Sequence, residues 1–236
     1  MSMLWSSFWL TLKTIIKELE MKKLLLSLLV LSGIHYTTYA QSDPKAKAIL
    51  AEVSKKYKSY DIVKTDFTFT LESPQRKGKE VQQGTLFVQS ATNKYKVLMT
   101  DQDMISDGKS QWSYLKKDKE AQVSAVDNND QALNPAKIFT LYEKGYKYIY
   151  NGDKKLGAKT YQMIDLSPID TKTSYFKIRL SIDKAAQRIA NVLIFDKNGN
   201  RYTYAVKTFV PNVKVPLSTF TFDAKKYPGV EVVDLR

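Results

Sequence analysis

Short stretches of alternating apolar and polar residues follow one another from residue 66 to residue 222, and they constrain the fold most. In the stretch 66–72, Phe67, Phe69 and Leu71 share one strand face, with threonines between them. Turn-forming Asp-Gly or Asn-Gly dipeptides stand at 107–108, 151–152 and 198–199. Strands are predicted over 66–72, 85–89, 94–100, 111–115, 122–126, 146–150, 160–166, 175–182, 189–195, 202–209 and 219–222. About eleven strands with short links indicate a mainly β fold with one antiparallel sheet or barrel.

One helical segment precedes this strand pattern, and a second lies within it. Asp43 and Pro44 are a capping residue and a first-turn proline, and apolar residues then recur at helical spacing as far as about Tyr60. A second, short amphipathic helix is predicted over 136–144, where Ile138 and Leu141 fall on one face with Tyr142. A short helix between β-hairpins often covers the concave side of a sheet, so we expect this segment to act as a lid.

Residues 21–40 have the pattern of an export signal, and residues 1–20 are a segment upstream of it. Lys22 and Lys23 precede an apolar run over 24–34, and small residues lead up to Ala40. The run is shorter than the roughly 20 apolar residues of a membrane span, which disfavours the alternative of an uncleaved anchor. We expect translation to begin at Met21 rather than Met1, cleavage at the 40–41 junction, and a single domain over 41–236.

The residue types that are missing exclude most catalytic chemistry. The chain has no cysteine, and its one histidine, His35, lies inside the predicted signal peptide. Catalytic Ser-His-Asp and Cys-His arrangements and most zinc sites therefore cannot form in the mature protein. Because Gln41 rather than cysteine follows the expected cut, no lipid anchor is predicted there. We predict no catalytic residues, no metal site and no cofactor.

The net charge of +13 favours anionic surroundings, but the lysines are spread along the chain, which argues against a nucleic-acid partner. Asp101 and Asp103 are the best candidate carboxylate pair for acid–base or metal chemistry, although solvated turn residues explain them more simply. Trp112 is interpreted as part of the core or of a cavity wall. With only two short helices to fill the concave face of the sheet, an apolar cavity for a lipid-like ligand is a reasonable inference.

Two motifs resemble those of a known family. One is Ser106-Asp107-Gly108-Lys109 followed by Trp112 and Tyr114. The other closes the chain: Phe220-Thr221-Phe222, then Pro228-Gly229-Val230, Val232, Asp234 and Arg236. In this order, together with the segments 84–88 and 134–142, they are similar to the periplasmic outer-membrane lipoprotein carriers of the LolA type. The resemblance implies an incomplete (half-open) antiparallel β-barrel whose open side is covered by helices.

The resemblance also implies a function: such carriers bind the acyl chains of lipoproteins and ferry them across the periplasm. The implied partners are an inner-membrane lipoprotein-releasing transporter and an outer-membrane acceptor, and the carrier itself is expected to be a monomer and not an enzyme. Ile138 and Leu141 are the candidate lid residues. The candidate cavity wall comprises Phe67, Phe69, Leu71, Leu86, Val88, Val97, Met99 and Trp112.

One position departs from the family pattern. Members commonly carry an arginine, implicated in lid closure, just after the strand that corresponds to 84–88, whereas here Ser90 stands there and Lys94 is the nearest cation. Lid closure must then use other contacts, or the chain belongs to a divergent branch. Two alternatives stay open: a carrier or sensor of another amphiphile, such as a glycolipid, and a carboxylate-based hydrolase that uses Asp101 and Asp103.

Overall fold

The computed structural model describes residues 43–126 and 139–236. Ser42–Arg236 form one compact unit. The predicted signal peptide (21–40) and the lid candidate Ile138 lie outside the described residues. Within the described part of the chain, no helix is long and apolar enough to cross a membrane.

Helix α2 (Pro44–Lys58) begins where the capping pattern predicted. The Asp43 carboxylate accepts hydrogen bonds from the backbone N–H groups of Lys45 (2.8 Å) and Ala46 (3.2 Å), which would otherwise have no partner at the helix start. The same carboxylate accepts from the N–H of Tyr150 (3.1 Å) on the neighbouring strand, so the cap also ties the helix to the sheet. One helix face is buried, through Ala46, Leu50, Val53, Ser54 and Tyr57.

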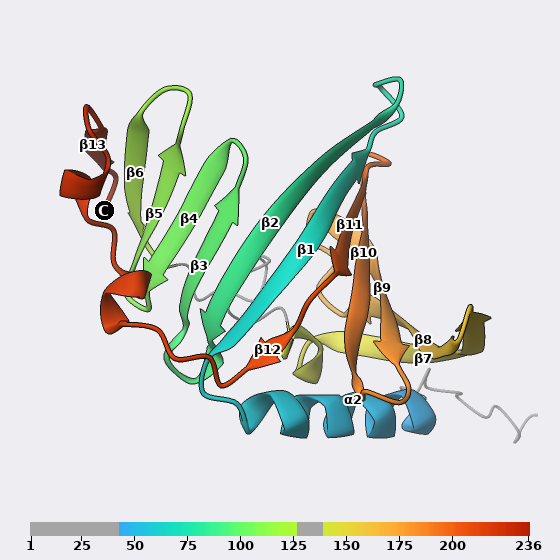
Figure 1. Cartoon of the computed structure of the whole chain (residues 1–236). Helices are drawn as coiled ribbons and strands as arrows, with labels where there is room; N and C mark the ends of the chain where they lie inside the picture. The colour runs from blue at the N-terminus through green and yellow to red at the C-terminus, as the bar shows by residue number, and fades with distance from the viewer. Residues whose placement is uncertain (1–42, 127–138) are drawn as a thin grey trace, which may run out of the picture. The chain divides into compact units, whose positions relative to one another are not determined.

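A single sheet forms the rest of the unit (Figure 1). Its strands are β1 (Val63–Glu72), β2 (Lys79–Gln89), β3 (Lys94–Met99), β4 (Gln102–Asp107), β5 (Ser110–Leu115), β6 (Glu120–Ala125), β7 (Tyr146–Leu156), β8 (Lys159–Pro168), β9 (Tyr175–Asp183), β10 (Arg188–Asp196), β11 (Arg201–Val206), β12 (Val210–Pro211) and β13 (Glu231–Asp234). The strand order is β13-β6-β5-β4-β3-β2-β1-β11-β10-β9-β8-β7, with β12 paired to β1. All described pairs are antiparallel except β6 with β13. The predicted fold class, mainly β with an open antiparallel barrel, is confirmed.

Some local predictions were wrong. Strand β4 was not predicted, and 219–222 is not a strand, because the 3₁₀ turn η4 (Leu217–Phe220) occupies its start. The dipeptide 151–152 is not a hairpin turn but lies inside β7, where the register with β8 shifts between Tyr150 and Asp153 and Gly152 adopts φ 90°. The described part of the predicted helix 136–144 contains only the 3₁₀ turn η3 (Leu141–Glu143). Two further 3₁₀ turns are η1 (Ser90–Thr92) and η5 (Ala224–Lys226).

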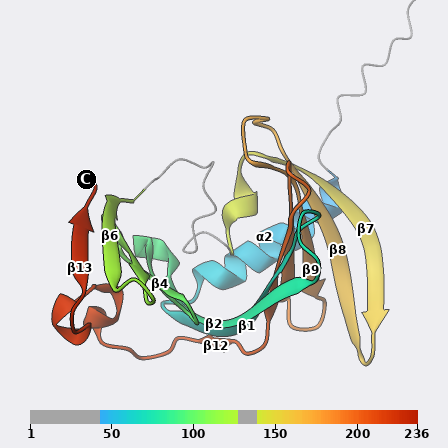
Figure 2. The same cartoon turned by 90° about the horizontal axis from the view of Figure 1, so that it is seen from above.

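The main core lies between α2 and the face of the sheet that we call the inner face (Figure 2). The buried helix residues join buried residues of β1–β3 and β7–β10 in one cluster. The cluster includes Ala46, Leu50, Val53, Tyr57, Val63, Phe67, Leu86, Val88, Tyr95, Val97, Ile164, Leu166, Ile178, Leu180, Ile182, Val192 and Ile194. Burial of this apolar area fixes α2 and the sheet relative to each other.

A second apolar cluster lies on the opposite, outer face of β4–β6. Ile105, Ala121 and Val123 are buried there, outside the main core, and Phe220 is buried nearby. The C-terminal segment contributes aromatic contacts: the Phe222 ring lies 6.5 Å from that of Trp112 and 4.7 Å from that of Tyr227, centroid to centroid. The C-terminal segment therefore covers this half of the sheet from outside.

Candidate functional site

Strand register brings seven of the eight predicted cavity residues onto the inner face. In β1 and β2, Phe67 lies opposite Gly84, and Val63 opposite Val88. In β2 and β3, Leu86 lies opposite Val97. Since opposed residues point to the same side of a sheet, one face carries the whole set: Phe67, Phe69, Leu71, Leu86, Val88, Val97 and Met99.

Burial divides these seven residues into two groups. Phe67, Leu86, Val88 and Val97 are at most 7% exposed and belong to the core cluster, so they support the site from below. Phe69, Leu71 and Met99 are only half-buried and form part of the accessible surface. The half-buried group is therefore the solvent-accessible part of the predicted wall.

Three further residues extend this surface and were not predicted. Tyr204 and Tyr202 of β11 lie opposite Phe69 and Leu71, and Met104 of β4 lies opposite Val97. The ring centroids of Phe69 and Tyr204 are 5.1 Å apart. The alternation of Tyr202 and Tyr204 could have shown that they share a face, but not that β11 pairs with β1. We call the set Phe69, Leu71, Met99, Met104, Tyr202 and Tyr204 the apolar strip.

Trp112 does not belong to this surface, so its assignment to the cavity wall was wrong. In β4 and β5 it lies opposite Ile105, and Ile105 lies opposite Lys96 in β3. The neighbours of Lys96 along β3 are Tyr95 and Val97, which point inward, so Lys96, Ile105 and Trp112 point outward. Trp112 instead packs in the outer cluster against Phe222.

The lid prediction stays largely untested. Ile138 lies outside the described residues, and Leu141 begins η3, but its side chain is not described. Next to it, Phe139 is buried and its ring stacks on that of Tyr57 in α2, with centroids 4.3 Å apart. Ser90, where the resemblance led us to expect an arginine, lies in η1 between β2 and β3 and is half-buried.

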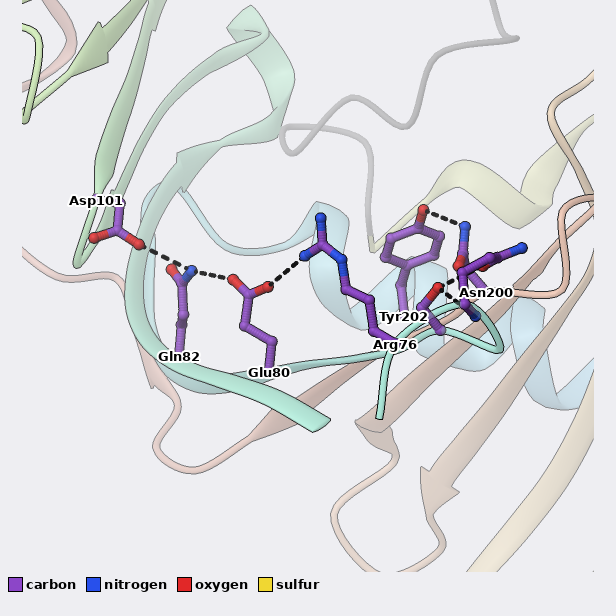
Figure 3. Close-up of polar contacts among 8 residues, drawn as sticks. Arg76, Glu80, Gln82, Asp101, Asn200 and Tyr202 are labelled. Atoms are coloured by element: carbon purple, nitrogen blue, oxygen red, sulfur yellow. Dashed lines mark hydrogen bonds and ion pairs between the residues drawn. The ribbon is translucent and has the colours of Figure 1, made fainter. Parts of the chain in front are cut away.

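A polar rim borders one end of the apolar strip (Figure 3). The Gln82 side-chain amide donates to Glu80 (2.8 Å) and to Asp101 (3.2 Å), and Arg76 lies 3.8 Å from Glu80. Gln82 lies opposite Phe69 across β1 and β2, so the rim is in register with the strip. Across from it, Asn200 donates to the Tyr202 hydroxyl at 3.5 Å. The site is thus an apolar surface that ends in exposed hydrogen-bonding groups.

Charged groups lie at the rim end of the strip, where Glu80 stands opposite Leu71 and the Tyr202 hydroxyl donates to Asp196 (3.3 Å). Burial raises the pKa of Tyr95 and the pKa of Tyr204 to about 12, so both phenols are neutral at physiological pH. The Tyr95 hydroxyl donates a short hydrogen bond to the Gln111 side chain. Neutral rings and thioethers can hold an apolar ligand without a counter-charge.

The carboxylates of Asp101 and Asp103 have different partners. Asp101 accepts from Gln82, whereas Asp103 is buried in β4 and forms an ion pair with Lys116 (2.8 Å). In the described part of the chain, no group of three or more acidic, histidine or cysteine side chains is placed to hold a metal. Among the described residues, the two carboxylates therefore have no partner in common.

A separate cleft of about 240 Å³ lies at the end of α2. Its cationic groups make internal contacts: the Lys56 ammonium donates to the Ala186 carbonyl (2.7 Å), and the Arg188 guanidinium lies 5.3 Å from the Phe209 ring centroid. The cleft is lined by Lys56, Tyr57, Tyr60, Ala186, Gln187, Arg188, Phe209 and Pro211. It does not include any residue of the apolar strip.

Comparison with known proteins gives one family match. The family model described as "Outer membrane lipoprotein carrier protein LolA" matches residues 58–223. No curated protein matched the sequence.

Similar solved structures include an uncharacterized conserved protein from Thermus thermophilus, with 14% identity, a TM-score of 0.52, and coverage of 80% of this chain and 99% of that chain. A LolA superfamily protein from Nitrosomonas europaea has 12% identity, a TM-score of 0.43, and coverage of 75% and 97%. A putative outer membrane lipoprotein-sorting protein domain from Vibrio parahaemolyticus has 14% identity, a TM-score of 0.44, and coverage of 75% and 96%. The Thermus protein supports the fold alone.

Proposed function

Because this chain belongs to the outer-membrane lipoprotein carrier (LolA) family, we propose that it is a periplasmic carrier that binds the acyl chains of lipoproteins. The observation that supports this proposal is the apolar strip on the inner face, half-buried and bordered by the polar rim. Each methylene group that leaves water gains about 0.8 kcal/mol, so a few contacts along an acyl chain give useful affinity.

In this proposal the protein performs no chemistry on its cargo. It would receive acylated proteins from an inner-membrane lipoprotein-releasing transporter and pass them to an outer-membrane acceptor. Transfer needs an acceptor that offers the acyl chains at least as much apolar surface as the strip does. An exported protein with a cleaved signal peptide would be located in the compartment where this transfer takes place.

Release of lipoproteins from spheroplasts tests the proposal directly. The purified protein is incubated with spheroplasts, and the soluble fraction is assayed for outer-membrane lipoproteins. We expect release by the natural protein and loss of release when Phe69→Ser and Leu71→Ser are combined. Val81→Ser is the matched control, because Val81 lies on the outer face of β2 and is 59% exposed. If the natural protein releases no lipoprotein, the proposed cargo is wrong.

A fluorescent fatty acid tests the site independently of the cargo. We expect it to bind the natural protein and the Val81→Ser control equally, and to bind the Phe69/Leu71 variant about tenfold more weakly or worse, since apolar contacts are lost. Equal binding by all three proteins would show that the apolar strip is not the acyl-chain site.

A further inference from the structure

The inner face changes character from apolar to polar between β3 and β6. On β4–β6 most of the positions that face inward carry uncharged amides and hydroxyls, as the register with Val97 and Tyr95 shows. We call the set Gln102, Gln111, Ser113, Gln122 and Ser124 the polar panel. All five of these residues are half-buried.

The outer cluster explains why this half of the inner face can be polar. The fully buried apolar side chains of β4–β6 point outward: Ile105, Ala121 and Val123 are at most 3% exposed. The fold therefore gains its apolar burial on these strands without using the panel positions. The panel residues therefore do not have to be apolar to stabilise these strands.

Most of the panel has hydrogen-bonding capacity to spare. Gln102, Ser113 and Ser124 form no side-chain hydrogen bond with any described residue. Gln122 donates to Glu120 (2.7 Å), and Gln111 accepts from Tyr95. An acyl chain placed over these groups would exclude water and leave them unpaired, which is costly. An acyl chain should thus avoid the panel.

The panel also selects against charged and sugar head groups. Among the inward-facing positions of β4–β6, Glu120 is the one charged residue, and no lysine or arginine stands there to pair with a phosphate. No panel residue is aromatic, so a sugar ring finds no flat apolar surface to stack on. Amides and hydroxyls instead offer donors and acceptors together, as a peptide backbone does.

We propose that the polar panel binds the uncharged polypeptide segment next to the acylated residue of the cargo, while the acyl chains lie on the apolar strip. The two surfaces adjoin, because Met104 of the strip lies opposite Ser113 of the panel. This inference rests on the proposed acyl-chain site and adds that the carrier recognises part of the polypeptide. Backbone groups of the segment replace the water that solvates the panel in the empty protein.

Competition with a bound fluorescent fatty acid tests the proposal. The competitors share one dodecanoyl chain and differ in the head: a simple amide, an uncharged tetrapeptide amide of serine, glycine and asparagine, a glucoside, or a phosphate ester. We expect the tetrapeptide to compete at about tenfold lower concentration than the simple amide, which corresponds to one or two added hydrogen bonds. The glucoside and the phosphate ester should compete no better than the simple amide.

Variants assign this difference to the panel. Combined Gln102→Leu and Gln122→Leu should bring the tetrapeptide to within about twofold of the simple amide, because the hydrogen bonds are lost. The affinity for the simple amide should not fall, because the leucines remove polar groups without removing any apolar contact. Ser113→Ala with Ser124→Ala is a milder pair that repeats the test if the leucine variants fold poorly. Gln83→Leu is the matched control, since Gln83 lies on the outer face of β2 and is exposed.

The possible failures are distinguishable. Equal competition by the tetrapeptide and the simple amide, with the fatty acid bound, overturns the panel but leaves the acyl-chain site intact. A glucoside or phosphate ester that competes better than the tetrapeptide overturns the choice of a polypeptide. If the fatty acid itself does not bind, the proposed function fails first and the inference fails with it.

Discussion

Gly84 and Phe67 form a close contact beneath the apolar strip, and a methyl group at residue 84 should disturb it. A Cβ on Gly84 would lie 2.4 Å from Cζ and 2.9 Å from Cε1 of the Phe67 ring. The ring is 7% exposed and lies 6.0 Å from that of Tyr204, centroid to centroid, so it has little room to withdraw. We expect Gly84→Ala to lower the free energy of unfolding by about 1–3 kcal/mol, as overpacking of a core does.

The same contact predicts a strong coupling between the two residues. Phe67→Ala alone should cost about 3–5 kcal/mol, because it leaves a cavity in the core. With the ring gone, Gly84→Ala meets no clash and should be neutral or stabilising by about 0.5–1 kcal/mol, since glycine is unfavourable inside a strand. The double-mutant cycle should therefore show a coupling free energy of about 1–4 kcal/mol.

Urea unfolding followed by circular dichroism measures all four proteins. The midpoint should fall for each single variant at an unchanged slope, because the surface exposed on unfolding stays similar. Val81→Ala on the exposed outer face of β2 is the control, and it should change stability by less than about 0.5 kcal/mol. If Gly84→Ala costs the same with and without the Phe67 ring, the contact does not determine the stability of this region.

Two further predictions concern the outer cluster and the loss of stability at low pH. Phe222→Ala should lower the free energy of unfolding by about 1–3 kcal/mol and shift Trp112 fluorescence to the red. Fatty-acid affinity should stay unchanged, because these rings stack on the outer face. A variant that lost affinity without losing stability would contradict this prediction. Hydrogen bonds from Thr208 and Thr85 lower the pKa of Asp66 below 3.8. Because the folded state favours the charged carboxylate, this stabilisation is present above pH 3.8 and is lost as the pH falls through the lowered pKa of the folded state. Asp66→Asn should therefore make the free energy of unfolding less dependent on pH in that range. An unchanged pH dependence would exclude Asp66 as a cause.

Helix starts and tight turns could be predicted from the sequence, because a single residue there interacts with its neighbours in the chain. Asp43 starts the helix because its carboxylate pairs with backbone N–H groups of the first turn. Asp107 and Gly108 form the turn between β4 and β5: the carboxylate of Asp107 accepts from the N–H groups of Lys109 and Ser110 (2.8 Å each), and Gly108 adopts φ 92°. Such interactions depend on neighbours in the chain, so sequence alone can identify them.

Strand β4 could not be found in the same way. It reads Gln-Asp-Met-Ile-Ser-Asp, which lacks a regular apolar alternation. Asp103 points to the same side as Ile105, and its burial there depends on the ion pair with Lys116 from the segment after β5. Asp103 and Lys116 meet only in the folded chain, so from the sequence alone Asp101 and Asp103 were interpreted as turn residues. The expectation that Asp101 and Asp103 act as a pair had the same cause.

The error at Trp112 concerns the face of the sheet to which its strand directs it, and not its residue type. Alternation shows which residues of one strand share a face, but relating two strands requires their register, and a shift of one residue exchanges the faces. That Trp112 packs against other apolar residues was foreseeable; the side of the sheet on which it packs was not. The seven residues of β1–β3 kept a common face because those strands follow one another through hairpins in a regular register.

The buried apolar side of the sheet changes between β3 and β4, and this change separates the family motifs from the ligand surface. Tyr95 and Val97 are buried inward in β3, whereas Ile105 in β4 is buried outward. The motif residues Trp112 and Phe222 pack together in the outer cluster. At the chain end, Arg236 pairs with Asp234 (2.5 Å) and donates to Ser110 (3.3 Å).

Trp112 and the C-terminal motif therefore attach the C-terminal segment to the outer face of β4–β6, while Asp107 and Gly108 form the turn between β4 and β5. These motifs identify the fold family, whereas under the proposed function the choice of cargo would depend on inner-face residues such as Phe69 and Ser113. A comparison of family members should then find the outer-cluster residues paired with one another even where the inner face differs. Substitutions that change the cargo should be sought on the apolar strip and the polar panel, because changes there leave the outer attachment, and with it the sheet, in place.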